Sequence, residues 1–367
     1  MVPVNRVLVR PHEPADDEGL ARLRRQAYPD WPEAHDEAWH RSIHRWLAES
    51  PYAAHMSRWV ATTGDTVVGH LAAVPLPYLI GGRSVIAHTP TDFMSSPGSG
   101  FHALALMRRF FRTCPDYVAC DSVPEALAIE KSFGVTEVGD LRSEMKLVDP
   151  SGYPNRPRGL PLSSLVIASI GTRALDRVLM GAHRRLPVHR LTSFDERFDE
   201  LVRVVSATVG CTVRKDAEFL TWRYGVGSPQ HPPTILAVVS ARSLLGYAVV
   251  RSTGDRDAYL LDLTASPGRA DVASSLLHGV VDQARQVGAA FLRYRFVPSP
   301  AAPSARTLAR LGFLNRDGSR YTLPGLRTSR RHTLLVRFAD DASDSIARDI
   351  DHWSYSIGDA EVSFWVK

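Results

Sequence analysis

Cysteine is scarce in this sequence, with only Cys114, Cys120 and Cys211 among 367 residues. An odd number of cysteines without CxxC spacing argues against a disulfide scaffold and against a zinc site. The length allows two domains that each bury a core, so no covalent or metal cross-link is needed. We therefore expect a cytoplasmic protein of a reducing compartment, without a metal site.

Long apolar runs are also missing. The longest run, 71–80, contains Pro75 and Pro77 and is too short to span a membrane. The first ten residues include Arg6 and Arg10, where a signal peptide would need an apolar core. We expect no membrane partner.

Charge of one sign is not concentrated anywhere in the chain. The formal net charge is +5, and the arginines are spread along the sequence. This excess favours anionic partners such as the phosphates of CoA, although an arginine-rich background composition is the simpler explanation. Nucleic acid is not expected as a partner.

The sequence does contain an internal repeat. Residues 92–98 and 262–268 share the pattern D-x-x-x-S-P-G at an offset of 170 residues. A strand-like run precedes each copy, and a segment with helical apolar spacing follows it. Another strand-like run and a short helical segment come next, and Gly134 and Gly312 close these segments at an offset of 178 residues. Matching features in the same order indicate two similar units.

Each copy of the repeat also follows helical segments and a hairpin-like pair of strands. The expected helices are 17–27 and 194–207, and the expected hairpin strands are 58–63 with 66–73 and 234–240 with 245–251. The predicted fold class is α/β (α+β), with two units that are each a mixed, mostly antiparallel sheet flanked by helices.

The predicted domains are residues 1–150 and 188–367, joined by a linker and connecting helix at 151–187. Four prolines and two glycines between residues 149 and 161 indicate the linker, and a helical pattern follows at 163–185. A further strand is expected at 333–338, in the second domain.

This order of elements resembles the GCN5-related N-acetyltransferase (GNAT) superfamily. Gly98-Ser-Gly100 stands where that family places its glycine-rich pyrophosphate loop, and Leu311-Gly-Phe313 resembles a typical ending. Segments 214–224 and 353–359 resemble segments of bacterial tandem-GNAT proteins. The resemblance implies an acyl-CoA co-substrate, such as acetyl-CoA, bound mainly by the first unit.

Two departures from the family pattern affect the chemistry. The loop motif begins with Ser95 in one half and Ala265 in the other, where the family has Arg or Gln. The tyrosine acid that the family often places four residues before the closing glycine is replaced by Glu130 and Leu308. The group that protonates the leaving thiolate is therefore open.

Unpaired amides at the start of the helix near Phe101 suit a pyrophosphate, because a helix N-terminus attracts anions. A main-chain N–H near Met94 would hold the thioester carbonyl. A tight turn without a ligand is the alternative interpretation. The predicted acyl-CoA-binding residues are Phe93, Met94, Ser95, Ser96, Gly98, Ser99, Gly100 and Phe101.

Asp92, His88 and Glu130 are the predicted catalytic residues. Strand alternation places Asp92, Met94 and His88 on one face, where Asp92 or His88 could accept a proton from the amine. Glu130 could serve as acid or base. Structural or solvated roles remain alternatives for all three. His40 and His44 have i,i+4 spacing, but we interpret them as part of a pocket wall or core helix instead of a metal site.

The sequence thus predicts an N-acyltransferase that acts on an amine of a small molecule, such as an aminosugar or a natural-product intermediate. The amine would attack the thioester directly, without a covalent enzyme intermediate. Two alternatives stay open: a Fem-like transferase that uses aminoacyl-tRNA, and a degenerate GNAT pair that binds CoA without turnover. The acyl chain and the oligomeric state, including a homodimer, are not determined.

Overall fold

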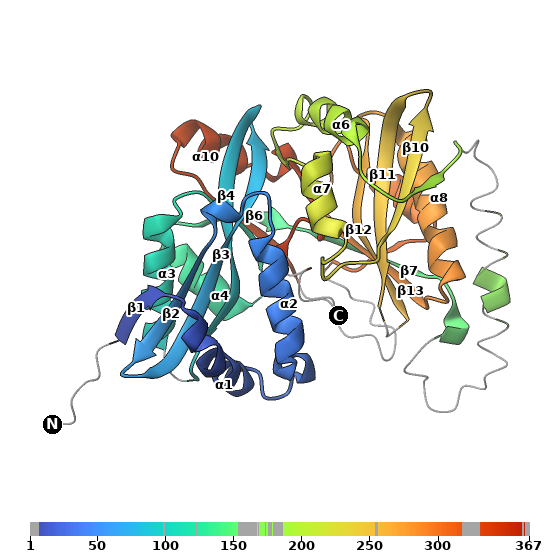
Figure 1. Cartoon of the computed structure of the whole chain (residues 1–367). Coiled ribbons are helices and arrows are strands. Elements are labelled where there is room, and N and C mark those ends of the chain that lie inside the picture. Colours follow the sequence, from blue (N-terminus) through green and yellow to red (C-terminus); the bar gives the residue numbers. More distant parts are fainter. Residues whose placement is uncertain are drawn as a thin grey trace.

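The computed structural model of the chain describes residues 7–97, 100–121, 123–152, 186–253, 256–317, 331–361 and 363, with scattered positions between 167 and 178. Two sheets stand side by side, each with helices on both faces (Figure 1). The predicted fold class, two mixed and mostly antiparallel sheets flanked by helices, is confirmed.

The first sheet is formed mainly by the N-terminal half of the chain, in the order β1-β2-β3-β4-β5-β15-β6. Its β4–β5 pair is parallel, and the other neighbours along this order are antiparallel. The strands are β1 (Val7–Pro11), β2 (Ser57–Thr63), β3 (Thr66–Ile80), β4 (Arg83–Ser95), β5 (Tyr117–Asp121), β6 (Thr136–Asp140) and β15 (Thr333–Arg337).

Amphipathic helices cover both faces of the first sheet, because each lays its apolar stripe on the sheet. Helices α1 (Asp17–Ala27) and α2 (Glu37–Ala48) pack on one face, through Leu20 and Ile43 among others. Helices α3 (Gly100–Thr113) and α4 (Pro124–Ser132) pack on the opposite face.

The second sheet has the order β14-β7-β13-β12-β11-β10-β8, with β12 and β13 parallel. Helices α6 and α7 lie on one face, and α8 and α9 lie on the other. The strands are β7 (Arg142–Leu147), β8 (His189–Leu191), β10 (Thr234–Ser240), β11 (Ser243–Ser252), β12 (Asp257–Ala265), β13 (Phe291–Phe296) and β14 (Leu314–Asn315). The helices are α6 (Glu196–Ser206), α7 (Ala217–Tyr224), α8 (Ala270–Gln286) and α9 (Ala305–Arg310).

The internal repeat is confirmed in three dimensions. The series β4–α3–β5–α4 in the first unit matches β12–α8–β13–α9 in the second. Both predicted hairpins are present, as β2–β3 and β10–β11. The repeated glycines Gly134 and Gly312 both end their helices with positive φ angles, 81° and 75°.

Two strands are exchanged between the sheets. Strand β7 leaves the first half and pairs with β13 of the second sheet, whereas β15 returns from the C-terminal segment to lie between β5 and β6. The expected strand at 333–338 therefore exists, but it belongs to the first sheet. The predicted boundaries at 150 and 188 stay a prediction, and the helical pattern at 163–185 lies mostly outside the described residues.

The remaining C-terminal elements also lie against the first unit. Strand β9 (Cys211–Val213) pairs with both β3 and β16 (Trp353–Ser354). Helix α10 (Asp341–Ala347) packs against β15 and β3. Among the helices in the described ranges, none combines the length and apolar character needed to cross a bilayer.

One hydrophobic core is shared by the two units. The Trp46 ring of α2 stacks on the Trp222 ring of α7, with centroids 4.7 Å apart. Each indole N–H donates to the other residue's main-chain oxygen, at 2.9 and 3.0 Å. These reciprocal contacts fix α2 against the second unit.

Candidate functional site

Strands β4 and β5 meet at one point and then separate. They pair at His88 and Tyr117, where the His88 N–H donates to the Asp116 carbonyl at 2.9 Å. No further β4–β5 pair is formed among the described residues, although β4 continues to Ser95. The two strands therefore separate beyond this pair, and we call the unpaired part the first splay.

The first splay leads to the N-terminus of α3. That helix begins at Gly100, where an added Cβ would meet no atom of the described residues within 4 Å. The next side chain, Phe101, is 83 % exposed. Thus no described side chain covers the main-chain amides at the start of α3. Such exposure is needed for an anion to bind there. Gly98 and Ser99 lie outside the described residues, so this part of the predicted pyrophosphate loop stays a prediction.

The second unit differs at the equivalent place. Beyond the paired part of β12 and β13, residues 355–358 enter between the strands. The Ile357 N–H donates to the Arg295 carbonyl of β13 at 2.9 Å, and the Gly358 N–H donates to the Leu261 carbonyl of β12 at 2.8 Å. The chain itself therefore fills the second splay.

A β-bulge interrupts β4 at Asp92. Two residues, Asp92 and Phe93, stand opposite Leu71 alone, and Asp92 has a φ angle of 50°. His88 lies opposite Pro75, whereas Met94 lies opposite His70, so His88 and Met94 are on opposite faces. The expectation that His88, Asp92 and Met94 share a face is thus wrong for His88, because the inserted residue shifts the alternation.

The Asp92 carboxylate lies on the α1–α2 face, with its side chain only 5 % exposed. Its Oδ2 accepts a hydrogen bond from Arg24 Nη2 of α1 at 2.7 Å. It also lies 3.1 Å from His44 Nε2 of α2 and 3.2 Å from His70 Nδ1 of β3. Burial acts to raise the pKa of Asp92, but Arg24 and the two imidazoles outweigh it and hold the pKa well below the usual range. The carboxylate is therefore ionised and poorly suited to accept a proton itself.

Several solved structures have a fold similar to that of this chain. A GCN5-related N-acetyltransferase from Anabaena variabilis superposes with a TM-score of 0.57 at 12 % identity, covering 91 % of this chain and 73 % of its own. A GCN5-related N-acetyltransferase from Kribbella flavida gives 0.56 at 14 % identity, covering 92 % and 72 %. Saccharomyces cerevisiae N-myristoyltransferase, solved with bound myristoyl-CoA, gives 0.56 at 10 % identity, covering 92 % and 81 %. The chain has a tandem GNAT fold.

No family model matches the sequence, and no curated protein matches it. The similarity is therefore one of tandem GNAT fold, shared at low sequence identity.

The other two predicted catalytic residues, His88 and Glu130, lie on the face of the first sheet that α3 and α4 cover. His88 Nε2 is 3.0 Å from the His55 main-chain oxygen, and burial lowers the pKa of this imidazole. Glu130 of α4 is 2 % exposed and lies near the Tyr117 phenol. Burial raises the pKa of Glu130 to about 8, so the carboxyl is mainly protonated at neutral pH. These positions place His88 and Glu130 on the opposite face from Asp92.

The predicted acyl-CoA contacts on β4 line the edge of the first splay. Phe93 is half-buried, and its carbonyl lies 3.4 Å from the Tyr28 hydroxyl. Met94 is buried against α1. Ser95 pairs with Gly69, and the Ser96 N–H donates to the Val68 carbonyl at 2.8 Å. The role of these residues in binding CoA stays a prediction.

Sequence reasoning missed the partners of Asp92. Arg24 is 68 positions away along the chain, and no local pattern connects the two. His44 had a usable signal, the i,i+4 spacing with His40, but this spacing indicated only a pocket wall or a core helix, without naming Asp92 as a partner. Its contact with Asp92 depends on how α2 packs against β4.

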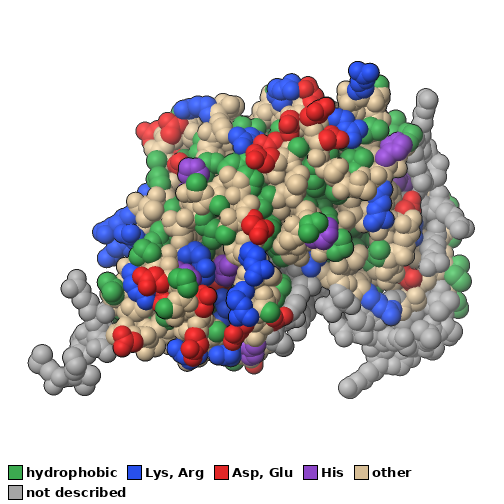
Figure 2. Space-filling view, in the orientation of Figure 1, with side chains coloured by type: hydrophobic (Ala, Val, Ile, Leu, Met, Phe, Trp, Pro, Cys, Tyr) green, Lys and Arg blue, Asp and Glu red, His purple; other side chains and the backbone are tan. Residues whose placement is uncertain are grey.

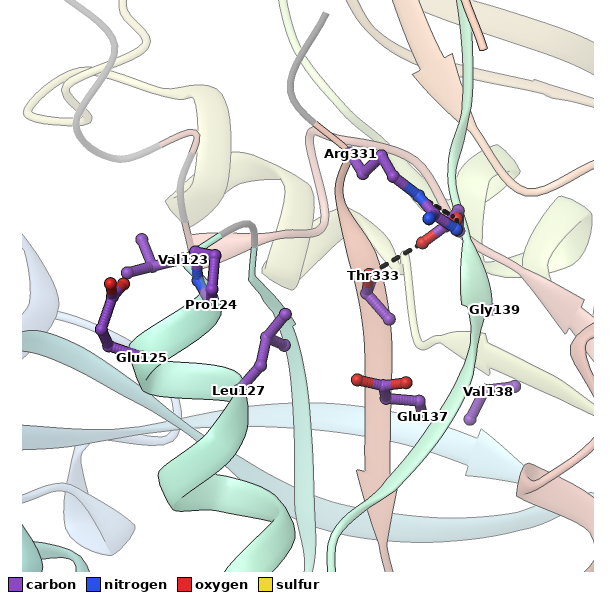
Figure 3. A pocket seen from close by; sticks show the side chains of 10 residues that line it. Val123, Pro124, Glu125, Leu127, Glu137, Val138, Gly139, Arg331 and Thr333 are labelled. Atoms are coloured by element: carbon purple, nitrogen blue, oxygen red, sulfur yellow. Dashed lines mark hydrogen bonds and ion pairs between the residues drawn. The ribbon is translucent and has the colours of Figure 1, made fainter. Parts of the chain in front are cut away.

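A cavity of about 860 Å³ opens on the α4 face (Figure 3). Leu127 of α4 and Glu137 of β6 extend toward it in Figure 3. At its rim, Arg331 and Thr333 both bond Asp140, with Thr333 Oγ1 donating at 2.7 Å. This cavity lies across the sheet from the Asp92 carboxylate and is separate from that cluster.

Proposed function

We propose that this tandem GNAT protein transfers an acetyl or longer acyl group from acyl-CoA to an amine of a small molecule, such as an aminosugar or a natural-product intermediate. The observation that carries the proposal is the contrast between the two splays. In the first, β4 and β5 are unpaired beyond His88 among the described residues and lead to the exposed start of α3, whereas residues 355–358 bond to both strands of the second. We expect one molecule of acyl-CoA per chain, in the first unit.

The donor would be held largely by main-chain groups. Amides at the start of α3 would bind the pyrophosphate, because unpaired N–H groups and the helix dipole favour an anion. An N–H on β4 near Met94 would stabilise the charge that develops on the thioester oxygen. The acetyltransferases and the myristoyl-CoA-bound transferase that share the fold support an acyl-CoA donor.

Glu130 fits the role of the acid that protonates the leaving thiolate. Its pKa of about 8 keeps a proton available at neutral pH. It stands at the position where the GNAT family often has a tyrosine, on the helix that follows β5. Asp92, which stays ionised, would act by orienting neighbouring side chains instead of exchanging the proton.

The two repeats offer a matched pair of variants to test the donor site. Gly100 and Ala270 are the first residues of α3 and α8, both are exposed, and they are 170 positions apart, as in the repeat. Gly100→Trp should cover the start of α3 and abolish the rise in melting temperature that acetyl-CoA or a longer acyl-CoA produces in the wild type. Ala270→Trp should leave that rise intact. At about 100 times Kd, a ligand stabilises by ~2.7 kcal/mol, enough for a shift of several degrees.

Turnover separates the proposal from the other two functions. Release of free CoA with at least one amine in a panel supports the transferase. A thermal shift without CoA release from any amine would favour a CoA-binding pair, and steeply salt-dependent tRNA binding would favour the aminoacyl-tRNA-dependent enzyme. No thermal shift with any acyl-CoA would reject the donor site.

A further inference from the structure

His44 is held by Asp92 in a defined orientation. Its Nε2 lies 3.1 Å from Asp92 Oδ2. Because an ionised carboxylate only accepts hydrogen bonds, Nε2 carries the proton of this contact. The other ring nitrogen, Nδ1, is buried and has no hydrogen-bond partner among the described residues. The ring thus presents a free lone pair on Nδ1.

The surroundings keep Asp92 ionised and the tautomer of His44 fixed. Arg24 of α1 donates to the same carboxylate oxygen at 2.7 Å. On β3, His70 Nδ1 lies 2.9 Å from the Asp92 main-chain oxygen, while its Nε2 lies 3.5 Å from Arg58 of β2. The charged and titratable groups that face His44 are therefore Arg24 of α1, Arg58 of β2, His70 of β3 and Asp92 of β4.

Burial is the largest effect on the pKa of His44 and lowers it to about 4, against the opposing effect of Asp92. The imidazole is consequently neutral at neutral pH, with its lone pair available. Burial makes it a weaker base than free imidazole, and Asp92 opposes this effect by favouring the protonated ring. A buried polar nitrogen without a partner is costly in a folded protein, and a donor that arrives with the substrate would satisfy it.

We propose that His44 is the general base that accepts the proton of the acceptor amine, and that Asp92 positions His44 for this step. The inference rests on the proposed acyl transfer. His44 and Asp92 lie on the α1–α2 face, whereas Glu130 lies on the α3–α4 face. His44 would therefore accept the proton of the amine on one face of the first sheet, and Glu130 would protonate the thiolate on the other.

The step balances with these groups alone. The neutral amine forms a bond to the thioester carbon, and its nitrogen becomes acidic as that bond forms. The proton passes from this nitrogen to His44 Nδ1, with Asp92 stabilising the imidazolium. The C–S bond then breaks, its electron pair leaves on sulfur, and Glu130 protonates the thiolate.

Replacing His44 by alanine tests the base and leaves space for a substitute. His44→Ala should lower kcat by about 10²- to 10⁴-fold, the usual contribution of a general base. KM for acyl-CoA should change by less than about twofold, since His44 lies on the other face from the donor helix. Added imidazole should restore part of kcat, which a purely structural role would not allow. His44→Gln serves as the second variant if the alanine variant does not fold.

Arg41→Gln is the control, because Arg41 is an exposed residue of the same helix that pairs with Glu37 instead of Asp92. It should keep kcat and should not respond to imidazole. A His44→Ala protein that is folded, binds acyl-CoA and either keeps kcat within about threefold or ignores imidazole overturns the inference and leaves the proposed function standing. A wild type that releases no CoA overturns both.

The tautomer gives a readout that does not depend on turnover. In ¹⁵N NMR spectra of the resting wild type, His44 should show a protonated Nε2 and an unprotonated Nδ1, and Asp92→Asn should disturb this pattern. A proton on His44 Nδ1 in the wild type overturns the inference.

Discussion

Glu130 shows how a single buried side chain can couple chemistry to stability. It is 2 % exposed in α4, and its Oε2 has no hydrogen-bond partner among the described residues. Ionising such a carboxyl inside the protein is unfavourable, which is the reason for its raised pKa. The same proton that suits a donor to sulfur therefore also stabilises the fold.

Glu130→Gln should flatten the dependence of stability on pH. The pKa of Glu130 is raised from 4.5 to about 8, so its contribution to stability is fully present below pH ~4.5 and is lost as the pH rises through ~8. The wild type should therefore lose melting temperature between about pH 5 and about pH 8, and the glutamine variant should lose less. Differential scanning fluorimetry across this range measures the effect.

Glu125→Gln is the control for this experiment, because Glu125 is an exposed residue of the same helix. Its profile should follow the wild type. Identical pH profiles for wild type and Glu130→Gln would contradict the raised pKa.

At the scale of elements, the C-terminal segment is fixed in the second splay by a buried ionic contact. Lys215 Nζ lies 2.9 Å from Asp359 of the segment and 3.1 Å from Asp262 of β12. Burial acts to lower the pKa of Lys215, but the two carboxylates outweigh it and raise the pKa. An added Cβ at Gly358 would come within 2.5 Å of the Leu261 carbonyl, so the segment packs directly against the strand.

Lys215→Met should destabilise the protein strongly, because it leaves Asp262 and Asp359 buried without a counter-charge. Breaking such a buried contact typically costs about 3–5 kcal/mol. Hydrogen exchange should show faster exchange of the amides in 355–361, and the melting temperature should fall.

Lys131→Met removes an exposed ion pair with Glu137 and is the matched control. It should cost only about 0–1 kcal/mol. Equal effects of the two substitutions would show that Lys215 does not fix the C-terminal segment.

At the scale of the whole molecule, the exchange of β7 and β15 joins the two units. Each sheet contains a strand from the other half of the sequence, and α2 shares a core with α7. The face shown in Figure 2 carries acidic and basic side chains interspersed over both halves among the described residues. The units should therefore unfold together.

Calorimetry should show one unfolding transition with equal calorimetric and van't Hoff enthalpies. Trp46→Ala removes the Trp46–Trp222 stack. It should lower the free energy of unfolding by about 3–5 kcal/mol and keep a single transition. Phe101→Ala, at an exposed ring, should change little. Two separate transitions in the wild type would contradict the shared core.

Local patterns predicted most elements correctly. The helix at 17–27 and both hairpins agree with α1, β2–β3 and β10–β11, because apolar periodicity and turn residues act over short stretches of chain. The bulge at Asp92 was not predictable in this way, because the pattern of β4 reads as regular alternation. The single inserted residue moved His88 to the other face from Asp92.

The sequence by itself determined the repeat, the α+β class and the order of elements, since these depend on residues that are close along the chain. Only the tertiary structure decided which strands are exchanged, that residues 355–358 close the second splay, and that His44 and Arg24 meet Asp92. These features are contacts between segments far apart in sequence. They form when burial and strand pairing are satisfied for the whole chain at once.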